Sequence, residues 1–413
     1  MPDNNSRYDL SDRLIHFFRN IDLSVADAPA WPEDLSHASI AEDEHLKPQF
    51  LLRHAIRLGR LYATWSVRKG RRTIHGLRPA VCFTEMPISA FIEAARIREA
   101  AGQAMSPYAL VFPKAAAFSV GARPVIYALS GNAYADGGTG DTPRLLSADV
   151  LPLDEQYRYV AFNPTKGSLD WSHEREWRWK LPTEPWQSED GGPPIYSDDL
   201  PGLNLDEPSL KGLGIIVKTA AEAEQVVYDV LTKADRGDIA PDHYTFVLAH
   251  ETIQDWDTLR DSGALEVAIQ NNLIDLSHYF EITEERTDYL VDQLSAEVES
   301  VIQDSDPPAT GEPGGCWLWL LENGHEFTRA MLRAGLARVS ETGKYLVPMR
   351  TFGYRGYNLR QRETMTTDLA DRLRQTFGIR TGYFSVLGSE DPNGLPSYNT
   401  DHLDDSLFYN WNI

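Results

Sequence analysis

The sequence predicts an α+β protein with a mixed-sheet N-terminal domain and a smaller α+β C-terminal domain. Apolar runs of strand length alternate with amphipathic stretches of helix length. The 413 residues exceed what one ordinary core holds. A stretch rich in proline, glycine and acids separates two regions. The predicted parts are an N-terminal domain over 1–260, a helical connector over 261–302, a linker over 303–315 and a C-terminal domain over 316–413.

The first half of the chain alternates between predicted strands and helices. Compact apolar runs with polar or proline ends indicate strands, and apolar residues at helical spacing indicate helices. The predicted elements are a strand at 14–19, a helical pattern over 48–65, a strand at 80–87, a helix at 88–104, strands at 108–112 and 123–129, and a helical turn at 114–119.

A strand-helix-strand unit follows in the second half. Residues 213–217, 220–233 and 244–249 carry its pattern. Gly212 and Gly214 do not follow the first strand and a third glycine is missing, so they are not a dinucleotide-binding fingerprint. The C-terminal domain is predicted to contain strands at 316–320, 345–349 and 383–387 and helices at 326–334 and 360–376.

Composition excludes several classes of protein. A formal net charge of −22 argues against non-specific attraction to nucleic acid or anionic membranes. Cys82 and Cys316 lie too far apart in sequence to indicate a disulfide framework or a cysteine zinc site. The first residues lack a signal-peptide pattern, and no apolar run approaches the roughly 20 residues of a membrane span. We therefore expect a cytoplasmic protein without a membrane partner.

One basic segment interrupts the acidic chain. It contains Arg53, Arg57, Arg60, Arg68, Lys69, Arg71 and Arg72. Two interpretations stay open: the segment grips a phosphate-bearing ligand, or it is a helix face paired with surrounding acids.

The stretch Trp171–Lys180 concentrates tryptophans and carboxylates. If it is one extended strand, Trp177 and Trp179 share one face, while Glu174, Glu176 and Arg178 share the other. Glu174 and Glu176 would then lie about 7 Å apart. The stretch is either a functional site or a solvated strand face with an ion-pair ladder.

The residue patterns that metal, phosphate-loop and serine-nucleophile sites require are absent from the sequence. The eleven histidines are scattered and none forms an i,i+4 pair beside a glutamate, so no metal site is predicted. A Walker loop and a Gly-x-Ser-x-Gly elbow are both absent. The remaining candidates are Glu174 and Glu176, with His16, Arg19 and Thr84 on or beside earlier strands.

Several motifs together resemble bacterial abortive-infection proteins of the AbiGi type. They are His16-Phe17-Phe18-Arg19, Val81-Cys82-Phe83-Thr84-Glu85-Met86-Pro87, Arg123-Pro124-Val125-Ile126-Tyr127 and His173-Glu174-Arg175-Glu176-Trp177-Arg178. The resemblance spans roughly residues 10–250. Residues from Gly314 onward resemble an uncharacterised bacterial C-terminal domain.

The motif order is also similar to the ADP-ribosyltransferase superfamily, which implies a site for NAD as substrate. By that resemblance His16 or Arg19 holds the NAD phosphate or ribose, and Thr84 supports it. Glu176 is then catalytic, and Glu174 orients the acceptor. The sequence departs from the family pattern because Phe83-Thr84-Glu85 replaces the usual Ser-Thr-Ser.

The resemblances lead us to expect an anti-phage defence protein that cleaves NAD or transfers ADP-ribose to a macromolecular acceptor. A second hypothesis is a non-enzymatic, antitoxin-like or sensor protein with a protein partner, in which Glu174 and Glu176 only form ion pairs with Arg175 or Arg178. A third hypothesis is an RNA nuclease that uses the basic segment.

Overall fold

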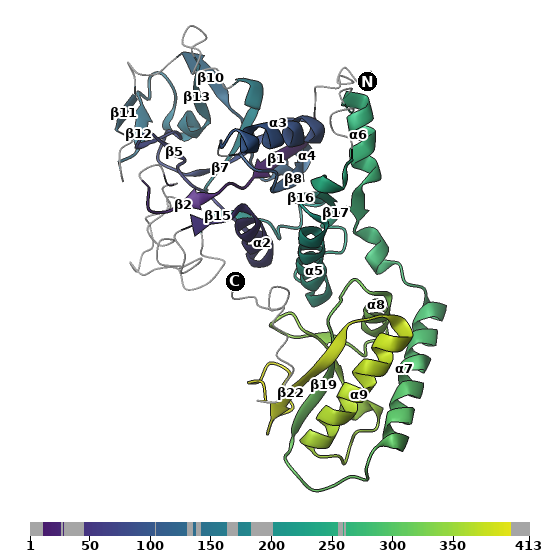
Figure 1. Ribbon diagram of the computed structural model, residues 1–413. Coiled ribbons are helices and arrows are strands. Elements are labelled where there is room, and N and C mark those ends of the chain that lie inside the picture. The colour runs from purple at the N-terminus through teal and green to yellow at the C-terminus, as the bar shows by residue number, and fades with distance from the viewer. Residues whose placement is uncertain are drawn as a thin grey trace. The chain divides into compact units, whose positions relative to one another are not determined.

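The chain folds into two compact units, which are described separately. The computed structural model describes residues 11–25, 28, 45–103, 105–129, 135–137, 142–162, 172–182, 201–254, 259 and 262–397. The N-terminal unit comprises chiefly Met1–Val226 and Asp242–Asp275, and the C-terminal unit comprises Val227–Pro241 and Leu276–Asn412. Both units contain helices and strands (Figure 1), so the predicted α+β class is confirmed.

The N-terminal unit is built on a mixed sheet. Neighbouring strands in this sheet are antiparallel except for β16 and β17, which are parallel. This parallel pair confirms the predicted strand-helix-strand unit. Within the described residues the sheet has eight strands, in the order β18 (Leu273–Asp275), β17 (Tyr244–Ala249), β16 (Leu213–Val217), β8 (Ala109–Pro113), β1 (Arg13–Phe17), β7 (Ala80–Thr84), β14 (Glu176–Lys180) and β9 (Arg123–Pro124).

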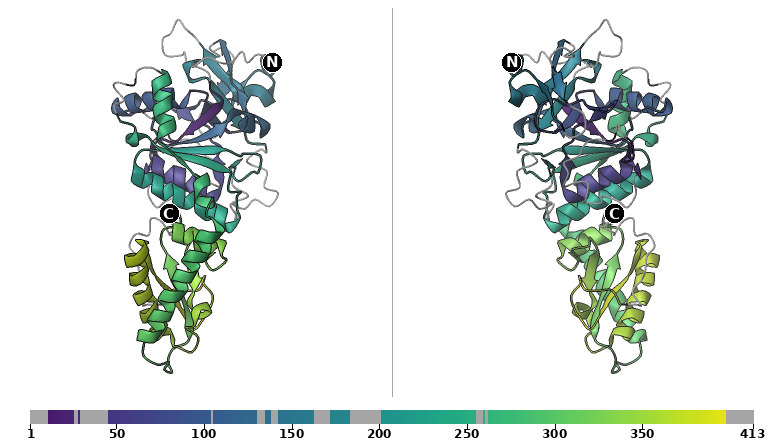
Figure 2. Two further views of the ribbon diagram at one scale, coloured as in Figure 1. Left: turned by 90° about the vertical axis from the view of Figure 1, so that its right-hand side faces the viewer. Right: turned by 90° about the vertical axis from the view of Figure 1, so that its left-hand side faces the viewer.

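Helices cover both faces of this sheet (Figures 1 and 2). On one face, α3 (Ile88–Ala100) and α6 (Ser262–Asn271) pack on buried side chains such as Ile15 and Val111. On the other face lie α2 (Pro48–Leu58) and the first turns of α5 (Ala220–Arg236). Burial of each large apolar side chain contributes roughly 1.5–3 kcal/mol, which holds the three layers together.

Short strand pairs surround the main sheet. They are β2 (Ile21–Asp22) with β3 (His45–Leu46), β4 (Arg60–Tyr62) with β15 (Gly202–Asn204), β5 (Val67–Arg68) with β6 (Arg71–Arg72), β10 (Ile126–Leu129) with β13 (Tyr159–Phe162), and β11 (Ala135–Gly137) with β12 (Arg144–Leu146). The helix α4 (Lys114–Ser119) follows β8, at the residues predicted for a helical turn.

The described part of the C-terminal unit contains an antiparallel sheet packed with helices. In the described part, its strand order is β20 (Arg338–Val339), β21 (Tyr345–Pro348), β19 (Gly314–Leu320) and β22 (Thr381–Leu387). Buried apolar side chains from α7 (Glu284–Asp304), α8 (Glu326–Arg333) and α9 (Leu359–Phe377) share one core with these strands.

The predicted linker lies inside this unit. Residues 305–313 join α7 to β19, and both elements belong to the C-terminal unit. The Leu359 amide at the start of α9 donates to the Glu312 carbonyl at 2.8 Å, and the Ala309 amide donates to the Gln361 side chain at 2.9 Å. These bonds fix the segment on α9.

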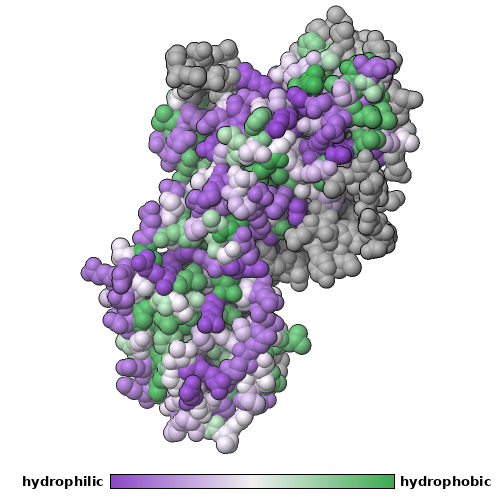
Figure 3. All heavy atoms as spheres, turned by 180° about the vertical axis from the view of Figure 1, so that it is seen from behind, coloured by the Kyte–Doolittle hydropathy of each residue, from purple (hydrophilic) through white to green (hydrophobic). Residues whose placement is uncertain are grey.

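Hydrophilic residues dominate the face shown in Figure 3, with small groups of hydrophobic residues between them. Large exposed apolar side chains are spread over many elements, for example Ile97 and Phe118. Among the residues that the structure describes, no helix is both long and apolar enough to cross a membrane.

Candidate functional site

The pairing of β7 with β14 places Thr84 directly opposite Glu176. In the same register Cys82 lies opposite Arg178. Cross-strand partners point to the same face of a sheet. Thr84, Cys82, Glu176 and Arg178 therefore form one group, called the Glu176 cluster below.

A short ion pair organises the Glu176 cluster. Arg178 Nε donates to Glu176 Oε1 at 2.6 Å, and the two side chains are 5% and 20% exposed. Arg178 also donates to the carbonyls of Tyr157 and Tyr159, at 2.6 and 3.3 Å. Burial alone would lower the pKa of Arg178, but the Glu176 carboxylate raises it on balance. The guanidinium is therefore a fixed cation that orients the carboxylate.

Cys82 is not a nucleophile in this cluster. Burial raises the pKa of its thiol to about 12, and the neighbouring Glu176 carboxylate adds to that rise. Because the thiolate is the reactive form, Cys82 stays an unreactive thiol near neutral pH.

The predicted strand over Trp171–Lys180 is wrong in its first half. β14 begins only at Glu176, and Ser172–Glu174 form a 3-10 turn. Arg175 has a positive φ of 44°, which breaks the extended backbone. Trp171 lies outside the described residues. Glu174 and Glu176 therefore do not share a strand face, although Trp177 and Trp179 alternate with Glu176 as predicted.

Contacts from the end of β7 hold this turn. The Thr84 hydroxyl donates to the Glu174 carbonyl at 2.6 Å, and the Glu85 amide donates to the Arg175 carbonyl at 3.2 Å. The Glu174 carboxylate turns to α3, where it pairs with Arg98 at 2.8 Å. Both candidate carboxylates are thus ion-paired, but with different partners.

His16 lies on the opposite face of the sheet from the Glu176 cluster. Ile15 pairs with Thr84, so the next residue along β1 points the other way. His16 Nδ1 lies 2.8 Å from the Cys82 carbonyl, and burial lowers the pKa of the imidazole to about 4. Arg19 follows β1 and is half-buried. The structure thus brings Thr84 and Glu176 together, and it directs His16 away from them.

Sequence reasoning missed a second polar group beside this cluster. Glu85 Oε1 pairs with Lys114 at 2.9 Å, and Glu85 Oε2 accepts a hydrogen bond from Trp177 Nε1 at 2.7 Å. Tyr127 accepts a hydrogen bond from the Glu176 amide at 3.2 Å. The position of Glu85 immediately after Thr84 was the available signal. For Lys114 and Tyr127, the sequence contains no comparable signal.

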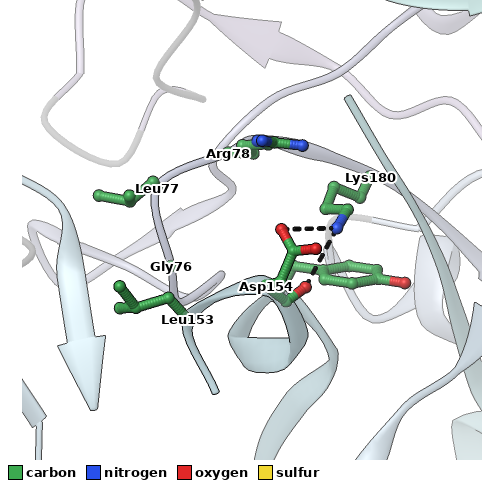
Figure 4. Close-up of a pocket in the computed structure, with 7 residues that line it drawn as sticks. Gly76, Leu77, Arg78, Leu153, Asp154 and Lys180 are labelled. Carbon is green, nitrogen blue, oxygen red and sulfur yellow. Dashed lines mark hydrogen bonds and ion pairs between the residues drawn. The ribbon is translucent and has the colours of Figure 1, made fainter. Parts of the chain in front are cut away.

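A small cavity lies at the other end of β14. Its lining includes Gly76, Arg78, Asp154 and Lys180 (Figure 4), and its volume is about 90 Å³. Lys180 pairs with Asp154 at 3.0 Å across it. Ligand pockets usually measure about 300–1,000 Å³, so this cavity has room for a few water molecules and not for a dinucleotide.

The basic segment divides into a buried and an exposed part. Arg53, Arg57 and Arg72 are buried, and the Arg72 guanidinium lies 4.2 Å from the centre of the Trp65 ring. These three side chains are unavailable for gripping phosphate or RNA. Arg68 and Lys69 are exposed on the β5–β6 hairpin.

Within the described ranges, no three His, Cys, Asp or Glu side chains form a group able to hold a metal ion.

A family model described as "Protein of unknown function (DUF4427)" matches residues 279–411. The match covers α7 and all four strands of the C-terminal sheet. The expected likeness of this region to an uncharacterised domain is therefore confirmed in that form, and the matched region begins before Gly314. No curated protein and no solved structure gave a match.

Proposed function

We propose that the N-terminal unit cleaves the nicotinamide–ribose bond of NAD, with Glu176 as the catalytic carboxylate, in a protein that protects bacteria against phage. The observation that carries this proposal is the direct opposition of Thr84 and Glu176 on neighbouring strands. The proposal also rests on the resemblance of the motifs on β1, β7 and β14 to AbiGi-type and ADP-ribosyltransferase sequences.

The chemistry requires a fixed carboxylate. As the bond between nicotinamide and C1 of the ribose breaks, its electron pair leaves with the neutral nicotinamide, and positive charge develops on the sugar. A carboxylate beside the ribose stabilises that transition state more than the ground state. A hydroxyl of the acceptor, or water, then bonds to C1 and loses its proton. In this scheme Glu176 stabilises the sugar cation and Arg178 holds Glu176 in place.

NAD fits this set of residues in part. Glu176 is the residue that would contact the ribose. The Thr84 hydroxyl already donates to the Glu174 carbonyl, so Thr84 would act by fixing the turn over 172–175. Since His16 lies on the other face, Arg19 is the candidate for the NAD phosphate among the two residues first considered.

A second candidate is a non-enzymatic protein that binds a protein partner in a defence system. The ion pairs favour it, because Glu174 binds Arg98 and Glu176 binds Arg178. Such pairing is what a purely structural role of the two carboxylates predicts.

The two candidates differ in infected cells. Bacteria that express the wild-type chain should resist phage and lose NAD on infection, because the cleavage consumes it. Glu176→Gln preserves shape and should abolish both effects. Glu155→Gln changes a more exposed carboxylate paired with Arg158, and it should leave both effects unchanged.

Protection that persists in Glu176→Gln, with constant NAD and a co-purifying protein, would reject the enzymatic proposal and support the binding one. Loss of protection in Glu155→Gln as well would show that the effect of Glu176→Gln is not specific to the Glu176 cluster.

A further inference from the structure

A second, larger cavity lies in the N-terminal unit, at the carboxyl ends of the parallel strands β16 and β17. Its volume is about 380 Å³, within the usual range for small-molecule pockets. Ligands of α/β sheets commonly bind at this edge. The lining includes Arg96 and Glu99 from α3, Lys218 after β16, and His250, Glu251 and Ile253 after β17. We call it the His250 cavity.

His250 is a buried polar side chain without a hydrogen-bond partner. It is 4% exposed, and neither Nδ1 nor Nε2 has a partner. Burial, together with the cations Arg96 and Lys218, lowers its pKa to about 4. The imidazole is therefore neutral near pH 7, and it offers one donor and one acceptor to whatever enters the cavity.

The lining of the cavity contains as many cationic as anionic side chains. Arg96 and Lys218 are cations, Glu99 and Glu251 are anions, and Lys218 Nζ lies 4.0 Å from Glu99 Oε1. A ligand that carries only one sign of charge would meet like charges as well as opposite ones. A ligand with both signs is complementary to the whole lining.

The start of α5 does not offer an anion site. Glu222 Oε2 already accepts hydrogen bonds from the backbone amides of Lys218 and Thr219, at 3.1 and 2.9 Å. The Tyr108 hydroxyl donates to the other oxygen of Glu222 at 2.8 Å. A phosphate group would therefore face a carboxylate where it usually finds free amides, which disfavours nucleotides.

We propose that the His250 cavity binds a small zwitterion of the free α-amino acid class with an uncharged side chain. Its carboxylate pairs with Lys218 and Arg96, and its ammonium group pairs with Glu99 and Glu251. The neutral imidazole supplies a further hydrogen bond. Ile253 is buried and lies against the apolar part of the ligand. This assignment does not depend on the proposed role of Glu176.

Calorimetric titration of the full-length protein tests the proposal. The probes are the uncharged L-amino acids, one at a time, followed by the deaminated and the decarboxylated analogue of the tightest binder, and inorganic phosphate. We expect at least one amino acid to bind with a Kd below about 1 mM. Each analogue should bind at least tenfold more weakly. The proposal is overturned if no amino acid binds, or if an analogue or phosphate binds as tightly.

Two variants locate the binding. Lys218→Met removes the cation and keeps the alkyl stem, so it should weaken binding at least tenfold. Lys211→Met is the control, since Lys211 is exposed and pairs with Asp242. His250→Phe keeps a buried ring, so it should preserve the melting temperature and weaken binding at least tenfold. Unchanged affinity in Lys218→Met or in His250→Phe would contradict the assignment.

Discussion

In the N-terminal unit, the positions of the candidate site residues depend on pairing between strands that lie far apart in the sequence. The sequence predicts that Thr84 and Glu176 belong to one site only through its resemblance to the ADP-ribosyltransferase superfamily. It cannot predict the face to which His16 points, because that depends on the register of β1 against β7. The Arg98–Glu174 ion pair is not predicted either. It joins α3 to a turn whose residues alternate in the way expected of a strand.

Buried neutral histidines give the protein an acid-sensitive stability. Both ring nitrogens of His75 are buried without a partner, and burial, with Arg144 and Arg178, lowers its pKa to about 3. The unfolded chain takes up a proton near pH 6.5, whereas the folded chain does not. The contribution of His75 to the free energy of unfolding is therefore fully present above pH 6.5, and it falls as the pH drops toward 3. Between pH 7 and pH 5, the loss of this contribution should lower the free energy of unfolding by about 2 kcal/mol.

Urea titrations of His75→Phe measure this contribution. The variant keeps an aromatic ring beside Tyr159, and its free energy of unfolding should fall by about 2 kcal/mol less than that of the wild type between pH 7 and pH 5. His173→Gln is the control, because His173 is 60% exposed. An identical fall in His75→Phe and the wild type would show that His75 is not kept neutral by the fold.

Elements follow the apolar pattern in their centres and depart from it at their ends. The helical pattern from Pro48 predicts a helix as far as Trp65, but α2 ends at Leu58 and β4 begins at Arg60. Gly59 adopts a left-handed φ of 63°, which ends the helix. β14 is shorter than predicted because the first half of the expected strand forms a turn, which Thr84 and Glu85 at the end of β7 hold by hydrogen bonds. The first ending depends on the backbone conformation of a glycine and the second on hydrogen bonds between distant residues, and hydrophobic periodicity encodes neither.

The β5–β6 hairpin offers a test of such a turn. Its two central residues, Lys69 and Gly70, have positive φ values of 52° and 67°. This conformation favours asparagine followed by glycine, and it strains a lysine. Lys69→Asn should therefore stabilise the N-terminal unit by roughly 0.5–1 kcal/mol, measured by urea unfolding. Lys69→Val, which is β-branched, should destabilise it. The reverse order would contradict the turn.

At the scale of the whole molecule, the α+β class is predictable, because apolar runs of strand length alternate with amphipathic stretches of helix length. The composition of the units is not. The later turns of α5 belong to the C-terminal unit, although Asp242–Asp275 of the N-terminal unit follow them in the chain. In that unit Arg329 makes two hydrogen bonds to Asp235, at 2.7 and 2.9 Å, and Tyr345 donates to Asp235 at 2.8 Å.

This buried pair should be essential to the C-terminal unit. Asp235 and Arg329 are 7% and 8% exposed, so Asp235→Asn leaves a buried guanidinium without its counter-charge. We expect a loss of roughly 3 kcal/mol, measured by amide exchange in β19 and β22. Asp238→Asn is the control, because its pair with Arg236 is open to solvent. Equal exchange rates in the two variants would contradict the role of α5 in this unit.

The release of nicotinamide from NAD by the purified full-length protein tests the central claim most directly. Chromatography of the reaction should show nicotinamide with the wild type and with Glu155→Gln, and none above the uncatalysed level with Glu176→Gln at the same melting temperature. Equal release by the wild type and Glu176→Gln, or no release by the wild type with bacterial extract as a source of acceptor, would contradict the assignment of Glu176 as a catalytic carboxylate.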